Sequence, residues 1–414
     1  MTYLSKTDPE IYRVINNEIK RQKETINLIA SENYASKAVL EAQGSIVQDK
    51  YAEGYPGKRY YPGCVNIDMI ETIAIERAKA LFKAEHANVQ PHAGAAANMG
   101  AYLALLEYGD TVLGMKLAHG GHMTHGDKIT FSGKSYNFIA YGIDKETERL
   151  DYAEVERLAK EYRPKLIVAG ASSYSRIIDF ERFRQIADIV GAKLMVDMAH
   201  IAGLVAVGLH PTPVPYADIV TSTTHKTLRG PRSAFILSRN EIAHKVDSAV
   251  FPQMQGGPLE HLVAAKAVCF FEASQPSFYS YQKAVIDNAQ ILASEVQRLG
   301  FRLVSGGTDN HLMAVDLTST GISGKHAQDA LEKVGIVANR NAIPFDPRPA
   351  YIASGIRLGT PAVTTRGFRQ AEIKQVAALF AKVLSHMGDA AIESQVKDEV
   401  LHLCSRFPIP GVDS

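Results

Sequence analysis

Cysteine is scarce in this sequence. Its 414 residues contain three cysteines, Cys64, Cys269 and Cys404, which lie far apart in the chain. An odd number of cysteines without the close spacing of metal ligands argues against a disulfide framework and against a cysteine metal site. We therefore expect a reduced, cytoplasmic location and no bound metal.

Neither an excess of one charge nor a long apolar run is present. Lys and Arg total 45 against 44 Asp and Glu, so nothing points to nucleic acid as the main partner. No run reaches the roughly 18 apolar residues that a membrane span requires. The first residues, M-T-Y-L-S-K-T-D-P, contain no apolar segment of a signal peptide. We expect neither a nucleic acid nor a membrane as a partner.

Strand and helix patterns alternate through the middle of the chain. Apolar strand patterns occur at 87–90, 111–115, 165–170, 193–196, 218–221 and 234–237, with helical patterns at 152–162 and 180–190. This alternation predicts an α/β domain with a doubly wound, mainly parallel sheet. Later helical patterns near 259–273, 282–299, 325–334 and 367–384, with strand-like segments at 301–304 and 312–317, predict a smaller α/β C-terminal domain.

The N-terminal part carries a helix and an unusual loop. Asp8 and Pro9 are typical of an N-cap and a first helical position. Four apolar residues at helical spacing predict a packing face on that helix: Ile11, Val14, Ile15 and Ile19. The segment 51–63 is rich in Gly, Tyr and Pro, and its several aromatic residues favour a binding loop over a simple linker.

The stretch T-S-T-T-H-K-T-L-R-G-P-R at 221–232 places Lys226 in the loop after a predicted strand. A loop lysine is ordinarily a solvated surface charge. Here the neighbours are hydroxyl residues, and Arg229 and Arg232 are expected to lower the pKa of the amine by like-charge repulsion. A partly neutral amine forms a Schiff base with an aldehyde, and the natural aldehyde is pyridoxal phosphate.

Pyridoxal phosphate also requires a carboxylate for its ring nitrogen and a site for its phosphate. The strand pattern G-A-K-L-M-V-D-M-A-H ends in Asp197, with His200 close behind. Acids at such strand ends face the ligand crevice of an open α/β sheet, although an Asp there is often only a turn former. The turn H-A-G-A-A-A-N at 92–98 opens a predicted helix, whose N-terminus is a natural anion site.

Taken together, these motifs resemble the serine hydroxymethyltransferase family of fold-type-I pyridoxal phosphate enzymes, which have an aspartate-aminotransferase-like large domain. The resemblance runs from about residue 28 to 368 and includes L-I-A-S-E-N-Y, K-Y-A-E-G-Y-P-G-K-R-Y-Y, L-A-H-G-G-H-M-T-H-G, D-M-A-H-I-A-G-L-V-A, Q-G-G-P, V-S-G-G-T-D-N-H and S-G-I-R-L-G-T-P. It implies an N-terminal helix and interface arm at 1–65, a cofactor-binding large domain at 66–280 and a small domain at 281–414.

The resemblance also implies roles for individual residues. The implied catalytic set is Lys226, which carries pyridoxal 5'-phosphate covalently, Glu53 as the proton-transfer group, His225 and Tyr61. Further cofactor contacts are implied for Asp197, His200, His122, Ser172, Ala93, Gly94, Ala95, Tyr51, Gly256 and Gly257. Ser31 and Arg357 are expected to bind the amino acid carboxylate, and Tyr61, Leu117, Gly121, Asn341, Pro349, Ala350 and Tyr351 to lie at the substrate or tetrahydrofolate site.

The implied reaction moves the hydroxymethyl group of L-serine to tetrahydrofolate and leaves glycine and 5,10-methylenetetrahydrofolate. A homodimer is expected, because Tyr51, Glu53 and Gly257 have a catalytic use only if they are supplied across an interface. Two alternatives remain open: a threonine aldolase or transaldolase that uses the same glycine carbanion, and an inactive folate- or RNA-binding paralogue. Three departures from the family pattern keep the first alternative open: the alanine-rich phosphate turn, Pro62-Gly-Cys-Val, and Gln253-Met254 before Q-G-G-P.

Overall fold

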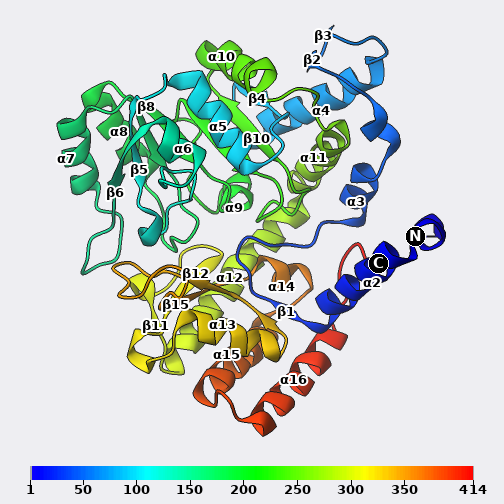
Figure 1. The fold of residues 1–414 in the computed structure, drawn as a ribbon, viewed down its shortest axis with the longest axis vertical. Helices are drawn as coiled ribbons and strands as arrows, with labels where there is room; N and C mark the ends of the chain where they lie inside the picture. The colour runs from blue at the N-terminus through cyan, green and yellow to red at the C-terminus, as the bar shows by residue number, and fades with distance from the viewer. Residues whose placement is uncertain (1, 414) are drawn as a thin grey trace.

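The computed structural model describes residues 2–413 and shows a large sheet covered by helices on both faces, above a second, smaller sheet (Figure 1). The large sheet has the strand order β4-β10-β9-β8-β7-β5-β6. Its strands are β4 (His86–Asn88), β5 (Thr111–Met115), β6 (Asn137–Tyr141), β7 (Leu166–Ala169), β8 (Lys193–Asp197), β9 (Ile219–Thr223) and β10 (Ala234–Ser238).

All neighbouring pairs from β9 to β6 are parallel, and only β10 runs antiparallel to its neighbours β9 and β4. The residues of β7, β9 and β10 are buried throughout. Continuous burial is typical of strands covered by helices on both faces. The predicted α/β fold with a mainly parallel sheet is confirmed, although β6 was not predicted.

The helices around this sheet begin and end at recognisable caps. The side chains of Asp151 and Asp179 accept backbone hydrogen bonds at the starts of α7 (Tyr152–Tyr162) and α8 (Phe180–Val190). Helix α8 ends at Gly191, which has the left-handed conformation that glycine tolerates best. The other helices on this part of the chain are α3 (Lys37–Gln43), α4 (Val65–Phe82), α5 (Gly94–Leu105), α6 (Phe131–Ser135), α9 (Ala202–Ala206), α10 (Ala243–Ser248) and α11 (Glu260–Ala273).

The smaller sheet is antiparallel and has the order β11-β12-β15-β14. It consists of β11 (Arg302–Leu303), β12 (Leu312–Asp316), β15 (Gly355–Gly359) and β14 (Asn339–Asn341), with helices α13 (Gly324–Lys333), α14 (Pro361–Thr365), α15 (Gln370–Ser385) and α16 (Ala390–Ser405) nearby. A short parallel pair, β1 (Ile26–Asn27) with β13 (Ile336–Val337), ties the N-terminal segment to this part.

Helix α12 (Pro276–Arg298) runs continuously between the two parts. Phe278, near its start, belongs to the core beneath the large sheet, whereas Leu292 belongs to the core of the smaller part. Ile26 and Leu28 also lie in that second core. The predicted domain boundaries near residues 65 and 280 stay a prediction. The first and last residues of the predicted domains, 1 and 414, lie outside the described residues.

The N-terminal helices are α1 (Thr2–Thr7) and α2 (Pro9–Glu24), and α2 lies at the edge of the molecule beside α16 (Figure 1). The predicted start is confirmed, because the Asp8 side chain accepts from the backbone N–H of Ile11 at 3.0 Å. The prediction that the apolar face of this helix packs against the rest of the chain is wrong, because Ile11 is 48% exposed and Val14 is 53% exposed. Helix α2 contains no buried residue, because its apolar side points away from both cores.

The predicted binding loop at 51–63 contains a small antiparallel hairpin, β2 (Gly54–Tyr55) with β3 (Lys58–Arg59). Single-turn helical segments complete the chain at Ile46–Asp49, Leu117–His119, Asn240–Ile242, Ala249–Met254, Val304–Gly306 and Thr318–Thr320. Within residues 2–413, no helix is both long enough and apolar enough to cross a membrane.

Candidate active site

A cavity of about 1060 Å³ opens where β8 and β9 of the large sheet end and faces β15 of the smaller sheet. Ligands bind at this end of parallel strands in open α/β sheets. Fifteen of the predicted site residues line this one cavity: Ser31, Ala93, Gly94, Ala95, Leu117, Gly121, His122, Ser172, Asp197, His200, His225, Lys226, Asn341, Ala350 and Arg357.

Lys226 follows β9 by three residues, in the loop position that was predicted, and lines this cavity. Burial lowers the pKa of its amine to about 8; the negative Asp197 opposes this shift, and Arg357 and Arg232 add to it. Arg357, rather than the predicted Arg229, is thus the second cation that acts on the amine. The guanidinium of Arg229 instead lies over the ring of Tyr281 at 4.8 Å, on a backbone turn with φ of 62°.

Asp197 ends β8 and is held as an anion by several donors. Its Oδ2 accepts from Asn98 Nδ2 at 2.9 Å and lies 3.1 Å from His125 Nε2, while Oδ1 accepts from the Ala199 N–H at 3.0 Å. Burial opposes ionisation, but the His125 hydrogen bond and the positive Lys226 hold the pKa of Asp197 below its ordinary value. Asn98 and His125 lie within the motifs of the sequence, but no contact with Asp197 was predicted for them.

The imidazole of His122 lies in the same wall. Its Nδ1 is 2.7 Å from Thr124 Oγ1, and burial lowers the pKa of His122 to about 4. The ring is therefore neutral near pH 7 and can stack on an aromatic ligand. His122, His125 and Asp197 also bring one ligand atom each within 4.8 Å of one another, a spacing that can hold a metal ion. The direct contact between His125 and Asp197 already engages one ligand atom of each.

His200 and Ser172 also line the cavity. The Nδ1 of His200 is 3.2 Å from Nε2 of His311, and burial lowers the pKa of His200 well below its usual range. Both rings are therefore uncharged. The backbone of Ser172 is fixed by a hydrogen bond from its N–H to the carbonyl of Gly120 at 2.7 Å.

The predicted phosphate turn lies at the N-terminus of α5. Ala93 is the N-cap residue and offers no side-chain hydrogen bond, so the first N–H groups of the helix remain available to a ligand. Thr223 adjoins this turn closely, since a Cβ on Gly94 would meet its methyl carbon at 2.7 Å. The buried hydroxyl of Thr223 has no hydrogen-bond partner among the described residues. No role was predicted for this donor from the sequence.

Arg357, in the middle of β15, reaches the cavity from the smaller sheet. Its Nη1 donates to the Ser172 carbonyl at 2.8 Å and its Nε to Asn339 Oδ1 at 3.3 Å, which leaves Nη2 for a ligand. Burial lowers the pKa of Arg357 to about 10, so the guanidinium stays charged near pH 7. Ser31 lies on the same cavity wall.

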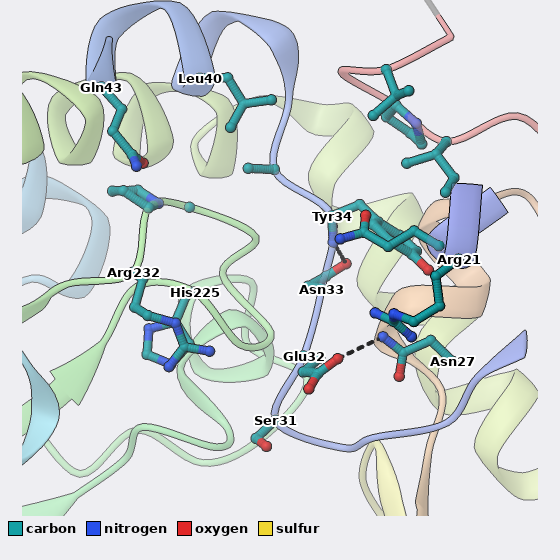
Figure 2. A pocket seen from close by; sticks show the side chains of 17 residues that line it. Arg21, Asn27, Ser31, Glu32, Asn33, Tyr34, Leu40, Gln43, His225 and Arg232 are labelled. Carbon is teal, nitrogen blue, oxygen red and sulfur yellow. Dashed lines mark hydrogen bonds between the residues drawn. The ribbon is translucent and has the colours of Figure 1, made fainter. Parts of the chain in front are cut away.

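A smaller cavity of about 300 Å³ adjoins the first and shares Ser31, Glu32, His225 and Arg232 with it (Figure 2). Burial, together with the positive Arg232 and Lys226, lowers the pKa of His225 to about 3. Its Nδ1 is buried without a hydrogen-bond partner in the described part of the chain. His225 therefore lies between the two cavities as a neutral ring.

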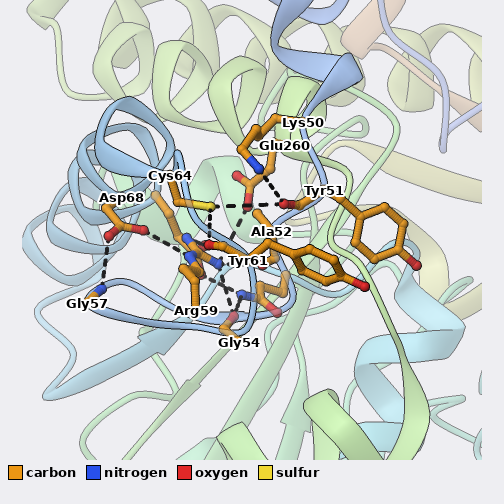
Figure 3. Close-up of polar contacts among 12 residues, drawn as sticks. Lys50, Tyr51, Ala52, Gly54, Gly57, Arg59, Tyr61, Cys64, Asp68 and Glu260 are labelled. Atoms are coloured by element: carbon orange, nitrogen blue, oxygen red, sulfur yellow. Dashed lines mark hydrogen bonds and ion pairs between the residues drawn. The ribbon is translucent and has the colours of Figure 1, made fainter.

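The predicted arm residues gather elsewhere. The rings of Tyr51 and Tyr61 pack edge to face with centroids 5.0 Å apart (Figure 3). A Cβ on Gly257 would meet the Tyr51 ring at 3.1 Å, and one on Gly256 would meet Glu53 Oε1 at 3.2 Å. None of these five residues lines the cavity of Lys226 in the same chain. They gather outside this cavity instead, where Tyr51 and Tyr61 are exposed and Glu53 is half-buried.

Only some of the residues predicted to contact tetrahydrofolate line the cavity of Lys226. Leu117, Gly121, Asn341 and Ala350 line the cavity, whereas Pro349 and Tyr351 do not. Tyr351 is 69% exposed and directly follows Ala350, which lines the cavity.

Comparisons with known proteins agree with this site. A family model described as serine hydroxymethyltransferase matches residues 4–380. Serine hydroxymethyltransferases of Dehalococcoides mccartyi are 61% identical in strain CBDB1 and 60% in strain ATCC BAA-2100, each over 414 residues that cover all of both chains. The protein of strain 195 is 61% identical over 415 residues, also at full coverage. The fold-type-I architecture is thereby confirmed, and the chain belongs to the serine hydroxymethyltransferase family.

Proposed function

We propose that this protein transfers the hydroxymethyl group of L-serine to tetrahydrofolate, reversibly, in a cavity built around Lys226. The observation that carries the proposal is the convergence of Lys226, Asp197 and Arg357, from three separate segments, on one cavity. An amine, a buried anion and a partly free guanidinium are what an amino acid and a pyridoxal cofactor require.

The residues present fit pyridoxal 5'-phosphate. Lys226 would form the covalent link, Asp197 would bind the ring nitrogen and His122 would stack on the ring face, while the N-terminus of α5 and the buried Thr223 hydroxyl would hold the phosphate. When bound, the cofactor withdraws electrons from the α-carbon of the amino acid. Asp197 supports this by remaining ionised, because its low pKa keeps a negative charge at the end of β8.

Lys226 is adapted to exchange with an incoming amine. With a pKa of about 8, roughly a tenth of it is neutral at pH 7, far more than for an ordinary lysine. Its neutral form is the nucleophile that the covalent link to the cofactor would require. His200 and His225 stay uncharged beside it, so they add no further positive charge to the site.

Arg357 and Ser31 are proposed to hold the carboxylate of serine or glycine. A guanidinium fork matches two carboxylate oxygens, and the contact of Nη1 with the Ser172 carbonyl fixes its plane. Leu117, Gly121, Asn341 and Ala350 are proposed to hold tetrahydrofolate, with Pro349 and Tyr351 near the opening. Keeping both substrates in one cavity makes the transfer effectively unimolecular.

The site is proposed to be completed by a second copy of the chain. The residues outside the cavity of their own chain are Tyr51, Glu53, Tyr61, Gly256 and Gly257, and the side chains of Tyr51 and Tyr61 are exposed. In a homodimer, Glu53 can exchange a proton with the substrates of the partner's cavity, with Tyr61 beside it, and Gly256 and Gly257 can offer N–H groups to the partner's phosphate. The exposed apolar side of α2 supports a homodimer as well.

A cytoplasmic location is proposed from the cysteines. Cys64, Cys269 and Cys404 are all buried and free, as in a reducing compartment.

An absorbance titration with glycine, with and without tetrahydrofolate, tests the proposed function. We expect glycine to produce a long-wavelength band whose intensity rises strongly when tetrahydrofolate is added. A band that responds to an added aldehyde and not to tetrahydrofolate would favour the aldolase alternative. The absence of any change with glycine would favour the inactive paralogue.

A further inference from the structure

Four ionisable side chains are buried together beneath the arm, outside the cavity of Lys226. The side chains of Arg59, Glu71 and Glu260 are 4%, 0% and 0% exposed, and Lys266 is 1% exposed. Burying an ion costs several kcal/mol unless good geometry offsets the loss of hydration. The chemistry proposed above uses none of these groups.

Arg59 holds the backbone of Ala52 and Gly54 (Figure 3), the residues on either side of Glu53 in the chain. Its Nη1 donates to the carbonyl oxygen of Ala52 at 2.8 Å and to that of Gly54 at 2.9 Å. The carbonyl of Glu53 itself accepts from the N–H of Tyr60 at 2.9 Å. Three consecutive carbonyls are therefore held, so the direction in which the Glu53 side chain leaves the backbone depends on Arg59.

Glu71, on α4, orients both side chains that hold the Gly54 carbonyl. Its Oε2 accepts from Nη2 of Arg59 at 2.6 Å, and its Oε1 accepts from Nε2 of Gln90 at 2.8 Å. That same Gln90 nitrogen donates to the Gly54 carbonyl at 2.9 Å. Charge-assisted hydrogen bonds of this kind are stronger and more directional than neutral ones. Losing the Glu71 acceptors would therefore release both donors.

Glu260, on α11, packs against this arrangement, with its Oε1 3.7 Å from Nη1 of Arg59. Burial raises the pKa of Glu260 to about 8, and the neighbouring Glu71 adds to the rise. Near pH 7 Glu260 is therefore mostly protonated and can donate its proton to Glu71. Lys266 lies alongside, and its Nζ donates to the carbonyls of Val89 and, at 3.0 Å, of Ala234.

We propose that Glu71 and Glu260 form a carboxyl pair that positions Glu53 for its proton transfer. A proton held between the two carboxyls leaves one negative charge facing Arg59. This charge orients Arg59 and Gln90, which donate hydrogen bonds to the backbone carbonyls on either side of Glu53. Both carboxyls are positioning residues, since neither lines the substrate cavity. The inference rests on the role of Glu53 in the proposed function.

The test compares Glu71→Gln with Glu76→Gln, a matched change on the exposed side of the same helix, where Glu76 is 62% exposed. A glutamine amide at position 71 can accept from only one of the two donors. We expect kcat for serine and tetrahydrofolate to fall about 10- to 100-fold in Glu71→Gln and to stay unchanged in Glu76→Gln. Glycine affinity, measured by absorbance, should change less than about twofold, because Arg357 and Ser31 lie elsewhere.

A double-mutant cycle with Glu53→Gln separates positioning from general damage. If Glu71 acts through Glu53, the loss caused by Glu71→Gln disappears when Glu53 is already replaced by glutamine. Losses that multiply instead would overturn the inference while leaving the role of Glu53 intact. Full activity of the Glu53→Gln single variant would overturn the proposed role of Glu53, and the inference with it.

Glu260 provides a rescue test. In Glu260→Gln an amide N–H can replace the shared proton, so kcat is expected to stay within about threefold of the parent, whereas Glu260→Leu should lose as much as Glu71→Gln. Equal losses in both Glu260 variants would contradict a shared proton. If the Glu71→Gln variant unfolds below the assay temperature, the Gln90→Met variant replaces it in the double-mutant cycle with Glu53→Gln. A loss of at least about threefold that disappears with Glu53→Gln is expected, and an unchanged kcat would refute the inference.

Discussion

The phosphate turn of this chain lacks a side-chain hydroxyl at the start of α5, where Ala93 is the N-cap residue. Thr223 packs against this turn at Gly94, and its buried hydroxyl has no partner among the described residues. Two opposite changes test whether this hydroxyl matters. Thr223→Val removes the hydroxyl at nearly constant volume, and Ala93→Ser adds one at the helix N-terminus.

The expected size follows from one hydrogen bond to a charged group. Such a bond contributes roughly 1.5 to 3 kcal/mol, which corresponds to about one to two powers of ten in affinity. Thr223→Val should loosen the cofactor by that factor and Ala93→Ser should tighten it. The serine introduced by Ala93→Ser should also cap α5 and raise the free energy of unfolding by about 0.5 to 2 kcal/mol.

The covalent link to Lys226 masks this difference until an amino acid releases the lysine. The assay is therefore dialysis against excess glycine, with the retained cofactor followed by absorbance. Loss should be slowest in Ala93→Ser, intermediate in the parent and fastest in Thr223→Val, with the exposed Thr212→Val as the control. Equal rates in all four proteins would show that backbone N–H groups and the partner chain already saturate the phosphate, and would refute the reasoning.

Four further predictions concern the remaining parts of the site. Lys226→Arg should fold but lose turnover, and borohydride reduction of the parent followed by peptide mapping should label Lys226 and no other lysine. Arg357→Ala should weaken serine and glycine binding by about 2 to 5 kcal/mol in calorimetry if the ion pair is desolvated; unchanged affinity would refute its role. The cofactor-free parent should gain stability relative to Lys226→Met as the pH rises from about 8 towards 10.5. The stability rises because the folded-state pKa of Lys226 lies below its unfolded value, so the unfolded chain binds more protons in that pH window. The gain in the free energy of unfolding, measured with denaturant, is at most roughly 3 kcal/mol. The same pH dependence of that free energy in both proteins would contradict the prediction. Sedimentation should show a homodimer, and a fully active monomer would exclude a site shared through Glu53.

Local patterns were sufficient for most elements of the large sheet. Helix α8 was predicted at its observed bounds, because Asp179 caps one end and Gly191 the other. The loop position of Lys226 and the strand end at Asp197 followed from apolar runs that stop at polar residues. These features depend on residues within a few positions of one another, and such features can be predicted from sequence alone.

Contacts between distant segments could not be predicted in this way. Asn98 and Asp197 meet across 99 positions, and Arg357 acts on Lys226 from the other sheet. Proximity in sequence favoured Arg229, but its left-handed backbone turns the guanidinium onto Tyr281. The prediction that the apolar face of α2 is buried in the same chain failed for a similar reason. Periodicity shows that a helix has an apolar face, but it does not show which surface covers that face.

The transfer of a labelled carbon tests the central claim most directly. The protein is incubated with tetrahydrofolate and L-serine that carries ¹³C at its hydroxymethyl carbon, and the products are followed by NMR. We expect the label to move to the bridging carbon of 5,10-methylenetetrahydrofolate while unlabelled glycine accumulates. Label that remains in serine, or that leaves only when another aldehyde is supplied, would contradict the account.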